Sequence, residues 1–485
     1  MAEPAPEVGG RRAAADILVQ VFARGGNLIL GIVVTVLLVR GLGDAAYGQW
    51  TTLFAIVQLA VVFSELGLEP AVVSRAAPDE EREGDWIGAL AMLRLLLSIP
   101  ASLISAIACL IIADSGEMEL AGILLSATLL GSVPSVLRAF NQLRVRNDVT
   151  MIVLTVNSVG WLAAVVVLAA RDAGIVAYAA AFLAVSLLSS GLQAVLSLRQ
   201  MRHPMRPARD LWRPIIKAGL ALGGAGILMS VGSRAPQIFV FELQGDVQAG
   251  LYGAASRLFE QAHFIPMAVM TTLLPIMSTA QRADPERARR VLETAIDYLV
   301  MVSLPGIPLA IVAGGPLLEF LFGVEFAAAA PALPVLLAAF VLVAVTYPLD
   351  NMVIVLGLQG RLIFIALTSV TLALTLNPVL INRMGFEGAA WAVLIVEAVV
   401  TVMTYRLVSS RLPFQVVTPR LVRIAIAAVI TGLVLWGLDT ISAPLFVLVG
   451  VTAIGYPALL VALGAINVAE LRALARRQPP PQLAD

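Results

Sequence analysis

Residues 17–39 read ILVQVFARGGNLILGIVVTVLLV, an apolar run of membrane-spanning length that contains one arginine, Arg24. A transmembrane helix needs about 20 predominantly apolar residues. A charged side chain in the hydrocarbon costs roughly 3 kcal/mol unless it faces water or a partner. Arg94, Arg234 and Arg257 lie in comparable runs. These four arginines predict a polar interior suited to an anion.

The composition of the whole chain agrees with a membrane protein. Of its 485 residues, 59% are hydrophobic and 13% are charged, whereas about 25% of residues in soluble domains are charged. Apolar runs recur from end to end and predict an all-α polytopic membrane protein with about fourteen transmembrane helices. Their approximate bounds are 17–39, 48–72, 87–112, 120–140, 150–170, 174–198, 215–241, 250–278, 298–322, 328–357, 362–382, 388–408, 420–438 and 443–466.

The basic residues indicate an orientation, because Lys and Arg concentrate in cytoplasmic loops. Of the 32 Lys and Arg residues, 25 fall on the side that holds both chain ends. Only Arg40, Arg171 and Arg383 fall on the other side, and the remaining four lie within spans. We therefore expect a multi-pass protein of the cytoplasmic (inner) cell membrane with both termini in the cytoplasm.

The sequence offers few residues for several other kinds of chemistry. Cys109 is the only cysteine, and the two histidines, His203 and His263, do not form a conventional zinc motif. The loops are too short for a soluble catalytic domain, and no GxxxxGK[ST] phosphate loop is present. The first run is too long for a signal peptide, so we expect a retained helix. These features favour a transporter without a metal or cofactor over an enzyme.

A short motif occurs twice. GDAAYG at 43–48 joins the first two predicted spans, and GDVQAGLYG at 245–253 joins the seventh and eighth. An even number of spans separates the two turns, so the halves of the chain would share an orientation and be related by an axis along the membrane normal. A chance match between two short motifs is the alternative.

The repeat predicts a domain organisation of two six-helix lobes with two helices appended. The linker between the lobes is rich in arginine, which suits contact with anionic lipid headgroups or, alternatively, serves only as a topology signal. The expected parts are an N-lobe at 1–200, the linker at 201–213, a C-lobe at 214–410, helices thirteen and fourteen within 411–466 and a cytoplasmic tail at 467–485.

One face of the first helix is polar. At 100° per residue, Asp16, Gln20, Arg24, Asn27 and Gly31 fall within an arc of about 80°. The arc predicts either a face lining a substrate cavity or hydrogen bonding between helices inside a bundle.

The second and third helices add to this polar interior. Gln58 and Glu65 follow Thr51 at heptad spacing, which places all three on one face. Arg24 and Arg94 each lie roughly 10 Å from the predicted cytoplasmic helix ends, and Glu65 lies at a similar depth. We expect an inner layer of Arg24, Glu65 and Arg94, with snorkelling of Arg94 to the interface as the alternative.

The seventh and eighth helices carry an outer group. Arg234 and Arg257 each lie about seven residues from the predicted outer end of their helix. Arg257 and Glu260 have the spacing of an intrahelical ion pair, and His263 follows three residues later. His263 is either a proton-coupling group or a hydrogen-bonded bundle residue.

Acidic residues within spans are candidates for ion coupling. They are Glu65, Asp350 and Glu397, to which His263 adds a neutral-range titrating group. The membrane potential is an alternative energy source, because it acts on an anionic substrate with about 2.3 kcal/mol per charge per 100 mV. The sequence does not distinguish these alternatives.

Several segments together resemble one family of membrane transporters. In chain order they are LVRGLGDAAYG at 38–48, ELGL at 65–68, GLYGAASRL at 250–258, LLEFLFGVEF at 317–326 and GFEGAA at 385–390. With the predicted topology, they resemble the polysaccharide-export, or lipid-linked oligosaccharide, flippases of the multidrug/oligosaccharidyl-lipid/polysaccharide (MOP) exporter superfamily.

The resemblance implies two lobes in a V around a central cavity and transport by alternating access. The implied substrate is a polyprenyl-diphosphate-linked oligosaccharide that moves from the cytoplasmic to the outer leaflet, and polymerase or assembly proteins are implied partners. Arg24 and Arg257 match the helices whose arginines bind the diphosphate in related flippases. Ser233-Arg234 is a departure, because many relatives carry an acidic residue there.

The residues themselves agree with such a substrate, since the planar arginine fork binds phosphate oxygens in a bidentate manner. A multidrug/cation antiporter or a peptidoglycan lipid-precursor flippase of the same superfamily is the alternative function. A membrane glycosyltransferase or polymerase is a further alternative, although such enzymes normally use a sizeable outer loop. The sequence does not reveal which glycan is carried.

Overall fold

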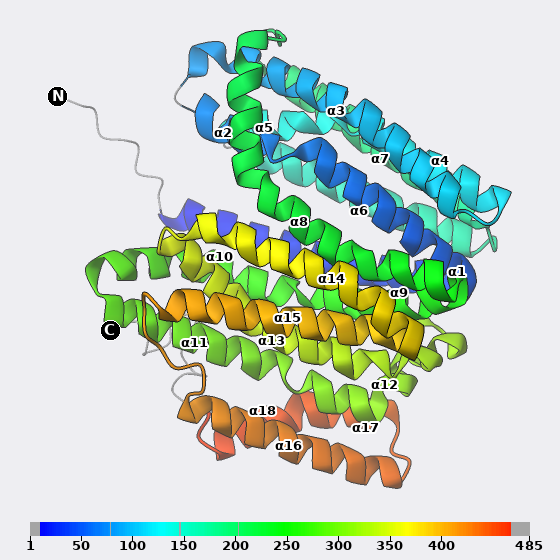
Figure 1. Ribbon diagram of the computed structural model, residues 1–485, viewed down its shortest axis with the longest axis vertical. Coiled ribbons are helices and arrows are strands. Elements are labelled where there is room, and N and C mark those ends of the chain that lie inside the picture. Colours follow the sequence, from blue (N-terminus) through cyan, green and yellow to red (C-terminus); the bar gives the residue numbers. More distant parts are fainter. Residues whose placement is uncertain (1–9, 78, 145–146, 202, 467–485) are drawn as a thin grey trace. The chain divides into compact units, whose positions relative to one another are not determined.

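The computed structural model describes residues 10–77, 79–144, 147–201 and 203–466, and the side chains within them except those of 10–29, 80, 147, 221 and 222. These residues form helices joined by short connections, with no β-strand among them (Figure 1). The expected all-α membrane protein is confirmed.

The chain divides into two compact units. The first consists of the described residues up to Leu42 together with Ile56–Gly223, and the second consists of Gly43–Ala55 and the described residues from Gly224 onward. The division cuts twice through a long helix, α1 (Gly10–Glu65), so the segment Gly43–Ala55 belongs with residues some 200 positions later. The basic linker and the start of α8 (Trp212–Gln244) belong to the first unit.

The first unit is a helical bundle. In it, α4 packs against both α3 and α7, and α7 also packs against α6. Its core includes Leu68, Ile87, Leu90 and Phe140, all at most 2% exposed. The helices are α2 (Leu68–Ala76), α3 (Glu83–Ile112), α4 (Gly116–Gly131), α5 (Leu137–Leu143), α6 (Asn147–Ala169) and α7 (Ile175–Leu198), with single turns η1 (Glu80–Arg82), η2 (Val133–Val136) and η3 (Arg209–Leu211).

The described part of the linker lies against the start of α3. Because Gly84 and Gly88 have no Cβ atom, the backbones of Pro204 and Arg206 can approach α3 closely. A Cβ atom on Gly84 would overlap Pro204, and one on Gly88 would overlap Arg206. The Arg206 amide donates to the Gly84 carbonyl at 3.3 Å. Close backbone approach of this kind is what glycine permits.

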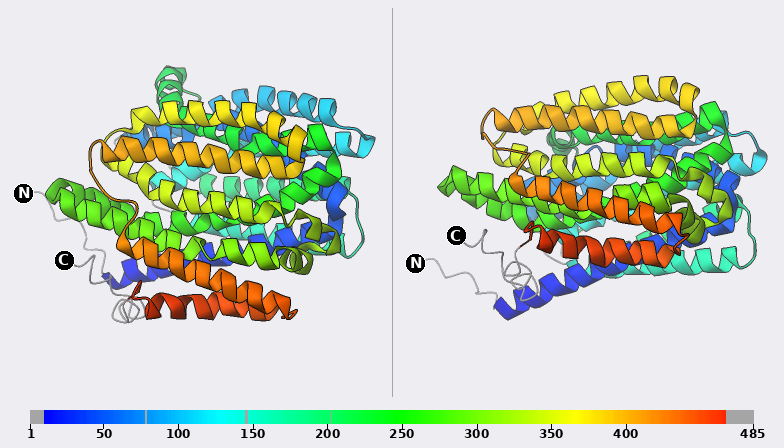
Figure 2. Two further views of the ribbon diagram at one scale, coloured as in Figure 1. Left: turned by 60° about the horizontal axis from the view of Figure 1, so that its bottom comes forward. Right: turned by 90° about the horizontal axis from the view of Figure 1, so that it is seen from below.

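The second unit contains the remaining helices, and one of its cores joins α10, α11, α13 and α15 around fully buried residues such as Met277, Leu292 and Leu349. The last helices lie along one edge, where α16 packs against α11, α12 and α18 (Figure 2). The helices are α9 (Asp246–Ala262), α10 (Phe264–Ala283), α11 (Pro285–Ser303), α12 (Gly306–Phe322), α13 (Ala332–Val355), α14 (Leu362–Met384), α15 (Phe386–Ser409), α16 (Pro419–Thr440), α17 (Leu445–Gly450) and α18 (Tyr456–Ala462), with the turns η4 (Val324–Ala329), η5 (Gln359–Arg361) and η6 (Val451–Gly455).

The number of membrane spans agrees with the sequence. By length and composition, twelve helices of the described chain are able to cross a membrane, or thirteen if the bent α8 counts as one span. One of the twelve runs from Leu30 to Ala76 and is interrupted at Gly43, whose backbone is not helical. Because that helix accounts for two crossings, the expected count of about fourteen is confirmed.

The two repeated turns have the same backbone conformation. Gly43 has φ 74° and ψ 178°, and Gly245 has φ 85° and ψ −178°. A positive φ of this size favours glycine over any residue with a side chain. At each turn the following aspartate accepts a bond from the next backbone amide, at 2.7 Å for Asp44 and 2.8 Å for Asp246. The sequence similarity of the two turns therefore corresponds to a shared structure.

The helices that follow these turns cross each other reciprocally within the second unit. Gly48 lies against the carbonyl of Asp246, and Gly250 lies against the carbonyl of Asp44, so close that a Cβ atom at either position would overlap the backbone. Each glycine thus makes room for the turn of the other repeat. This contact explains why the motif has a glycine five residues after its first one, at Gly48 and at Gly250.

Candidate functional site

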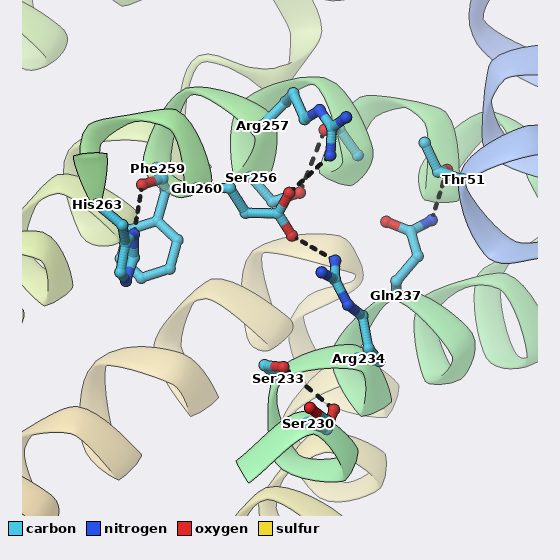
Figure 3. Close-up of polar contacts among 11 residues, drawn as sticks. Thr51, Ser230, Ser233, Arg234, Gln237, Ser256, Arg257, Phe259, Glu260 and His263 are labelled. Carbon is cyan, nitrogen blue, oxygen red and sulfur yellow. Dashed lines mark hydrogen bonds and ion pairs between the residues drawn. The ribbon is translucent and has the colours of Figure 1, made fainter. Parts of the chain in front are cut away.

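Three charged side chains meet between α8 and α9 in the second unit. The carboxylate of Glu260 lies between two guanidinium groups, with Oε1 at 2.7 Å from Nη1 of Arg234 and Oε2 at 2.9 Å from Nη1 of Arg257 (Figure 3). The intrahelical pair expected from the spacing of Arg257 and Glu260 is present. The bridge to Arg234 adds a second helix to it.

This arginine pair is partly accessible and carries excess positive charge. The side chains of Arg234, Arg257 and Glu260 are 29%, 36% and 34% exposed. One carboxylate neutralises one of two guanidinium charges, which leaves a charge of about +1 on the group. Each guanidinium has about five N–H donors, and its bond to Glu260 uses one nitrogen. The site is therefore able to accept a further anion.

Gln237, whose role is not apparent from the sequence, fixes the position of α8 beside this pair. Its amide nitrogen donates to the hydroxyls of Thr51 at 2.9 Å and Thr52 at 3.3 Å, and to the carbonyl of Ala249 at 3.1 Å. In the sequence, only its position one turn after Arg234 on the same helix indicates that it lies near the arginine pair. Gly253 lies against Thr51 and Gln237, so the glycine-rich start of α9 lets these segments approach.

Two buried tyrosines complete the surroundings of the arginine pair. Tyr47 and Tyr252 are 2% and 4% exposed. Tyr47 lies close enough to Arg257 to interact electrostatically, and Tyr252 does so with Glu260 and Arg234. Both tyrosines belong to the repeated motif, which therefore supplies two buried aromatic residues near the charged group.

His263 ends α9 and is held by its neighbours. Its Nδ1 lies 2.9 Å from the carbonyl oxygen of Phe259, and its ring packs on Phe259 and Phe340 with centroid distances of 4.7 and 5.9 Å. This is the geometry of the hydrogen-bonded alternative. A coupling role for His263 stays a prediction.

The first unit contains a separate ion pair. Nη2 of Arg94 on α3 lies 2.8 Å from Oε1 of Glu65, the last residue of α1. The Arg94 side chain is 8% exposed and reaches across to Glu65 rather than out of the unit. Leu66 and Gly67 follow with left-handed φ values of 46° and 67°, so the pair lies beside a break in the chain. Gln58 is partly buried in the same unit.

Three of the expected cavity residues are placed only by their backbone. Gln20, Arg24 and Asn27 belong to α1, but their side chains lie outside the described residues. The expected inner layer of Arg24, Glu65 and Arg94 thus has two members whose side chains are seen to meet.

The two remaining acidic candidates lie on neighbouring helices of the second unit. Asp350 is on α13 and Glu397 on α15, and they interact electrostatically. Among the described residues, no group of three or more His, Cys, Asp or Glu side chains is arranged to hold a metal ion.

The family comparison concerns most of the first unit and the arginine pair. A family model described as "Polysaccharide biosynthesis protein" matches residues 37–331, more than half of the chain. The chain belongs to this family. The matched segment contains both repeated turns and the residues Arg94, Arg234, Arg257 and Glu260.

Solved structures of the MOP superfamily share the fold of this family member. A structure described as lipid II flippase MurJ in an inward closed conformation matches with a TM-score of 0.74 at 13% identity, over 95% of this chain and 100% of that chain. An inward-facing multidrug resistance MATE family transporter matches with a TM-score of 0.66 at 16% identity, over 80% and 94%. A MOP superfamily transporter from Pyrococcus furiosus Vc1 matches with a TM-score of 0.53 at 17% identity, over 82% and 92%.

These comparisons show that the chain belongs to a polysaccharide biosynthesis family and has the fold of MOP superfamily transporters. At such low identities the structures show the common fold and leave the substrate open. A comparison with curated protein sequences gave no match.

Proposed function

We propose that this protein flips a polyprenyl-diphosphate-linked oligosaccharide from the cytoplasmic to the outer leaflet for cell-surface polysaccharide synthesis. The family supports a role in polysaccharide biosynthesis, and the resemblance of the sequence motifs to lipid-linked oligosaccharide flippases supports the substrate class. The proposal places the protein in the cytoplasmic membrane with both termini inside, beside the enzymes that polymerise or assemble the glycan.

The arginine pair of Arg234 and Arg257 carries this proposal. Moving a diphosphate through hydrocarbon unaided would desolvate its charge at great cost. Two guanidinium groups that share one carboxylate have donors to spare, and arginine forks suit phosphate oxygens. The diphosphate would bind between the arginines, while the neutral glycan and the polyprenyl tail contact other surfaces.

Glu260 has a defined part in this mechanism. Its two oxygens occupy the positions that phosphate oxygens would take on Arg234 and Arg257. Binding of the substrate therefore exchanges one anion for another, so the arginines are never left without a counter-charge. The same exchange in reverse assists release in the opposite leaflet.

The test is flipping of a fluorescent lipid-linked oligosaccharide by purified protein in vesicles. We expect Arg257→Gln and Arg234→Gln each to reduce the rate at least tenfold, because each removes charge-assisted bonds of about 1.5–3 kcal/mol. Arg289→Gln is the matched control: Arg289 also binds two carboxylates, those of Glu286 and Glu293, and is 33% exposed. Flipping at the normal rate by both site variants would refute the assignment.

The same vesicles distinguish the alternative functions. Flipping of a peptidoglycan lipid precursor without flipping of lipid-linked oligosaccharides would reassign the substrate. Cation-driven efflux of a dye would indicate a multidrug antiporter, and transfer of sugar by the purified protein would indicate a glycosyltransferase or polymerase. Each of these outcomes contradicts the proposed function.

The proposed orientation has its own test. Cys109 is the only cysteine and is fully buried, so a Cys109→Ala protein gives a background for single cysteines. Gly174 and Gly360 are exposed in loops on opposite predicted sides. We expect a membrane-impermeant thiol reagent added to intact cells to label Gly174→Cys and to leave Gly360→Cys unlabelled. The reverse pattern would invert the orientation.

A further inference from the structure

A cavity lies in the second unit beside the connection between α15 and α16. Its volume is about 540 Å³, which is within the range of ligand-binding pockets. One residue of α13, three residues of α15 (Thr401, Val402 and Tyr405) and the stretch 414–417 of the connection line it. More than half of these side chains are valine or phenylalanine. The ring of Phe414 packs edge to face on Tyr405, with the centroids 5.3 Å apart.

The connection that forms one wall of the cavity is held in place by α11. The backbone amide of Gln415 donates to Oε1 of Glu293 at 3.1 Å, and the hydroxyl of Thr418 donates to Oδ1 of Asp297 at 2.9 Å. Glu293 also accepts a bond from Arg289 at 3.2 Å. Both carboxylates of α11 are therefore engaged, and the wall has a defined position.

The cavity reaches into the membrane-spanning part of the unit. Both α13 and α15 are long and apolar enough to cross a membrane. The hydroxyls of Thr346 on α13 and Thr401 on α15 meet at 2.7 Å, and α15 ends eight residues later at Ser409. At 1.5 Å per residue, the cavity extends about 12 Å from the helix end. The hydrocarbon of one leaflet is about 15 Å thick, so this depth suits one lipid chain.

Two arginines lie at the mouth of the cavity. Arg406 is in the last turn of α15, directly after Tyr405 and one turn after Val402. Arg411 lies between the end of α15 and the wall at 414–417. Both side chains are exposed, and neither is paired with another residue in the described part of the chain. The apolar cavity therefore opens beside two guanidinium groups that have all their donors available.

This combination matches the chemistry of an anionic phospholipid. An acyl chain fits an apolar cavity within the hydrocarbon, and arginine forks bind phosphate oxygens at the level where the helix ends. Basic pockets between membrane-spanning helices bind anionic headgroups in this way. A neutral lipid would leave both guanidinium groups unused, and free phosphate would leave the cavity unused.

We propose that this cavity binds an anionic phospholipid of the surrounding membrane. One acyl chain lies between α13, α15 and the connection, and the phosphate contacts Arg406 and Arg411. The bound lipid bridges α15 and the connection that leads to α16, which stabilises the attachment of the last helices. It is a resident ligand and not the transported molecule, so the inference does not rest on the proposed function.

Fluorescence quenching by lipids with brominated acyl chains tests this directly. Val417 lines the cavity and is exposed, so Val417→Cys in the Cys109→Ala background carries a bimane label at the mouth. The labelled protein is reconstituted in phosphatidylcholine with increasing fractions of either brominated lipid. We expect brominated phosphatidylglycerol to reach half-maximal quenching at about a fivefold lower mole fraction than brominated phosphatidylcholine, the preference that one arginine near the headgroups gives.

The arginines and the cavity are tested by separate variants. Arg406→Gln with Arg411→Gln should abolish the preference for phosphatidylglycerol, while Arg282→Gln, an exposed arginine at the end of α10, should keep it. An unchanged preference in the double variant would overturn the proposal.

Filling the cavity leaves both arginines in place. Val402→Trp puts a large side chain into the cavity, and Val429→Trp on α16 is the matched change at another exposed valine. The preference should be lost in the first variant and kept in the second. A preference that survives Val402→Trp would mean that the arginines attract headgroups without a chain in the cavity, which contradicts the proposed site.

Competition identifies the source of the phosphate. Glycerol phosphate, which has the headgroup without chains, should not relieve the quenching by brominated phosphatidylglycerol. A polyprenyl diphosphate should relieve it no better than unbrominated phosphatidylglycerol at the same mole fraction. Stronger relief by the polyprenyl diphosphate would assign the cavity to the transported lipid and overturn the proposal. No lipid flipping is measured, so failure of this test and failure of the proposed function are distinct results.

Discussion

The two units each contain arginines bonded to a glutamate, but the two groups differ in charge balance and exposure. In the first unit, one arginine faces one glutamate, and the Arg94 side chain is 8% exposed. In the second unit, Glu260 forms ion pairs with both Arg234 and Arg257, whose side chains are 29% and 36% exposed. A charge-balanced pair with a buried arginine suits a structural role, whereas an unbalanced group with two accessible arginines suits binding of an anion.

The neighbourhood of each group supports this distinction. Glu65 ends α1 just before two residues with left-handed φ values, and its bond to Arg94 joins that break to α3. Glu260 lies in the last turn of α9, which ends at Ala262, and its side chain joins α9 to Arg234 of α8. The first pair therefore joins a break in the chain to α3 with matched charges, while the second group joins two helices with one more arginine than its carboxylate neutralises.

The largest expected effect is on transport when both arginines of the second unit are removed. Arg234→Gln with Arg257→Gln should reduce flipping of a lipid-linked oligosaccharide at least about 100-fold, since two sets of charge-assisted bonds are lost. Flipping per folded molecule in vesicles is the measurement. Retention of more than a tenth of the rate would show that the diphosphate binds elsewhere.

Removing the arginine of the first unit should instead lower stability. Arg94→Gln leaves Glu65 without its partner, and we expect a loss of about 2 kcal/mol for a pair that is half in contact with solvent. Cys109 lies in the same unit and is fully buried, so a thiol-reactive dye reports the melting of this unit. Exchange of the charges in Arg94→Glu with Glu65→Arg should restore part of the melting temperature, and no recovery would argue against the pair.

Neutralising the glutamates gives an intermediate effect that differs between the units. Glu260→Gln removes the carboxylate that competes with a bound anion for Arg234 and Arg257. Binding of inorganic pyrophosphate, measured by calorimetry, should then tighten about tenfold, the equivalent of 1.4 kcal/mol. Glu65→Gln is the matched change in the first unit and should leave pyrophosphate binding unaltered. Equal effects of the two variants would remove the distinction between the groups.

The contrast between the units also shows what the sequence could and could not predict. The spans, the repeated turns and the Arg257–Glu260 pair follow from local spacing, and all are present. The Arg234–Glu260 bridge joins residues 26 positions apart and depends on how α8 packs on α9, which periodicity does not encode.

The same limit explains contacts that could not be predicted from the sequence. Gln237 bonds to Thr51 and Thr52, which reach it only because Gly43–Ala55 joins the second unit. Thr346 of α13 meets Thr401 of α15, hydroxyl to hydroxyl at 2.7 Å, because of the rotation of these helices about their own axes. A hydrophobic pattern that is apolar on nearly all sides of a helix gives little information on that rotation.

The smallest expected effect comes from salt. The Debye length falls from about 10 Å at 0.1 M to about 3 Å at 1 M ionic strength, so partly exposed charges are screened and buried ones much less. We expect wild-type affinity for pyrophosphate to fall severalfold between these conditions, because Arg234 and Arg257 are accessible. The melting temperature reported by Cys109 should change less, since the Arg94 side chain of the other pair is only 8% exposed. A salt-insensitive affinity would mean that the anion binds away from the arginine pair, and the comparison between the two groups would then lose its functional meaning.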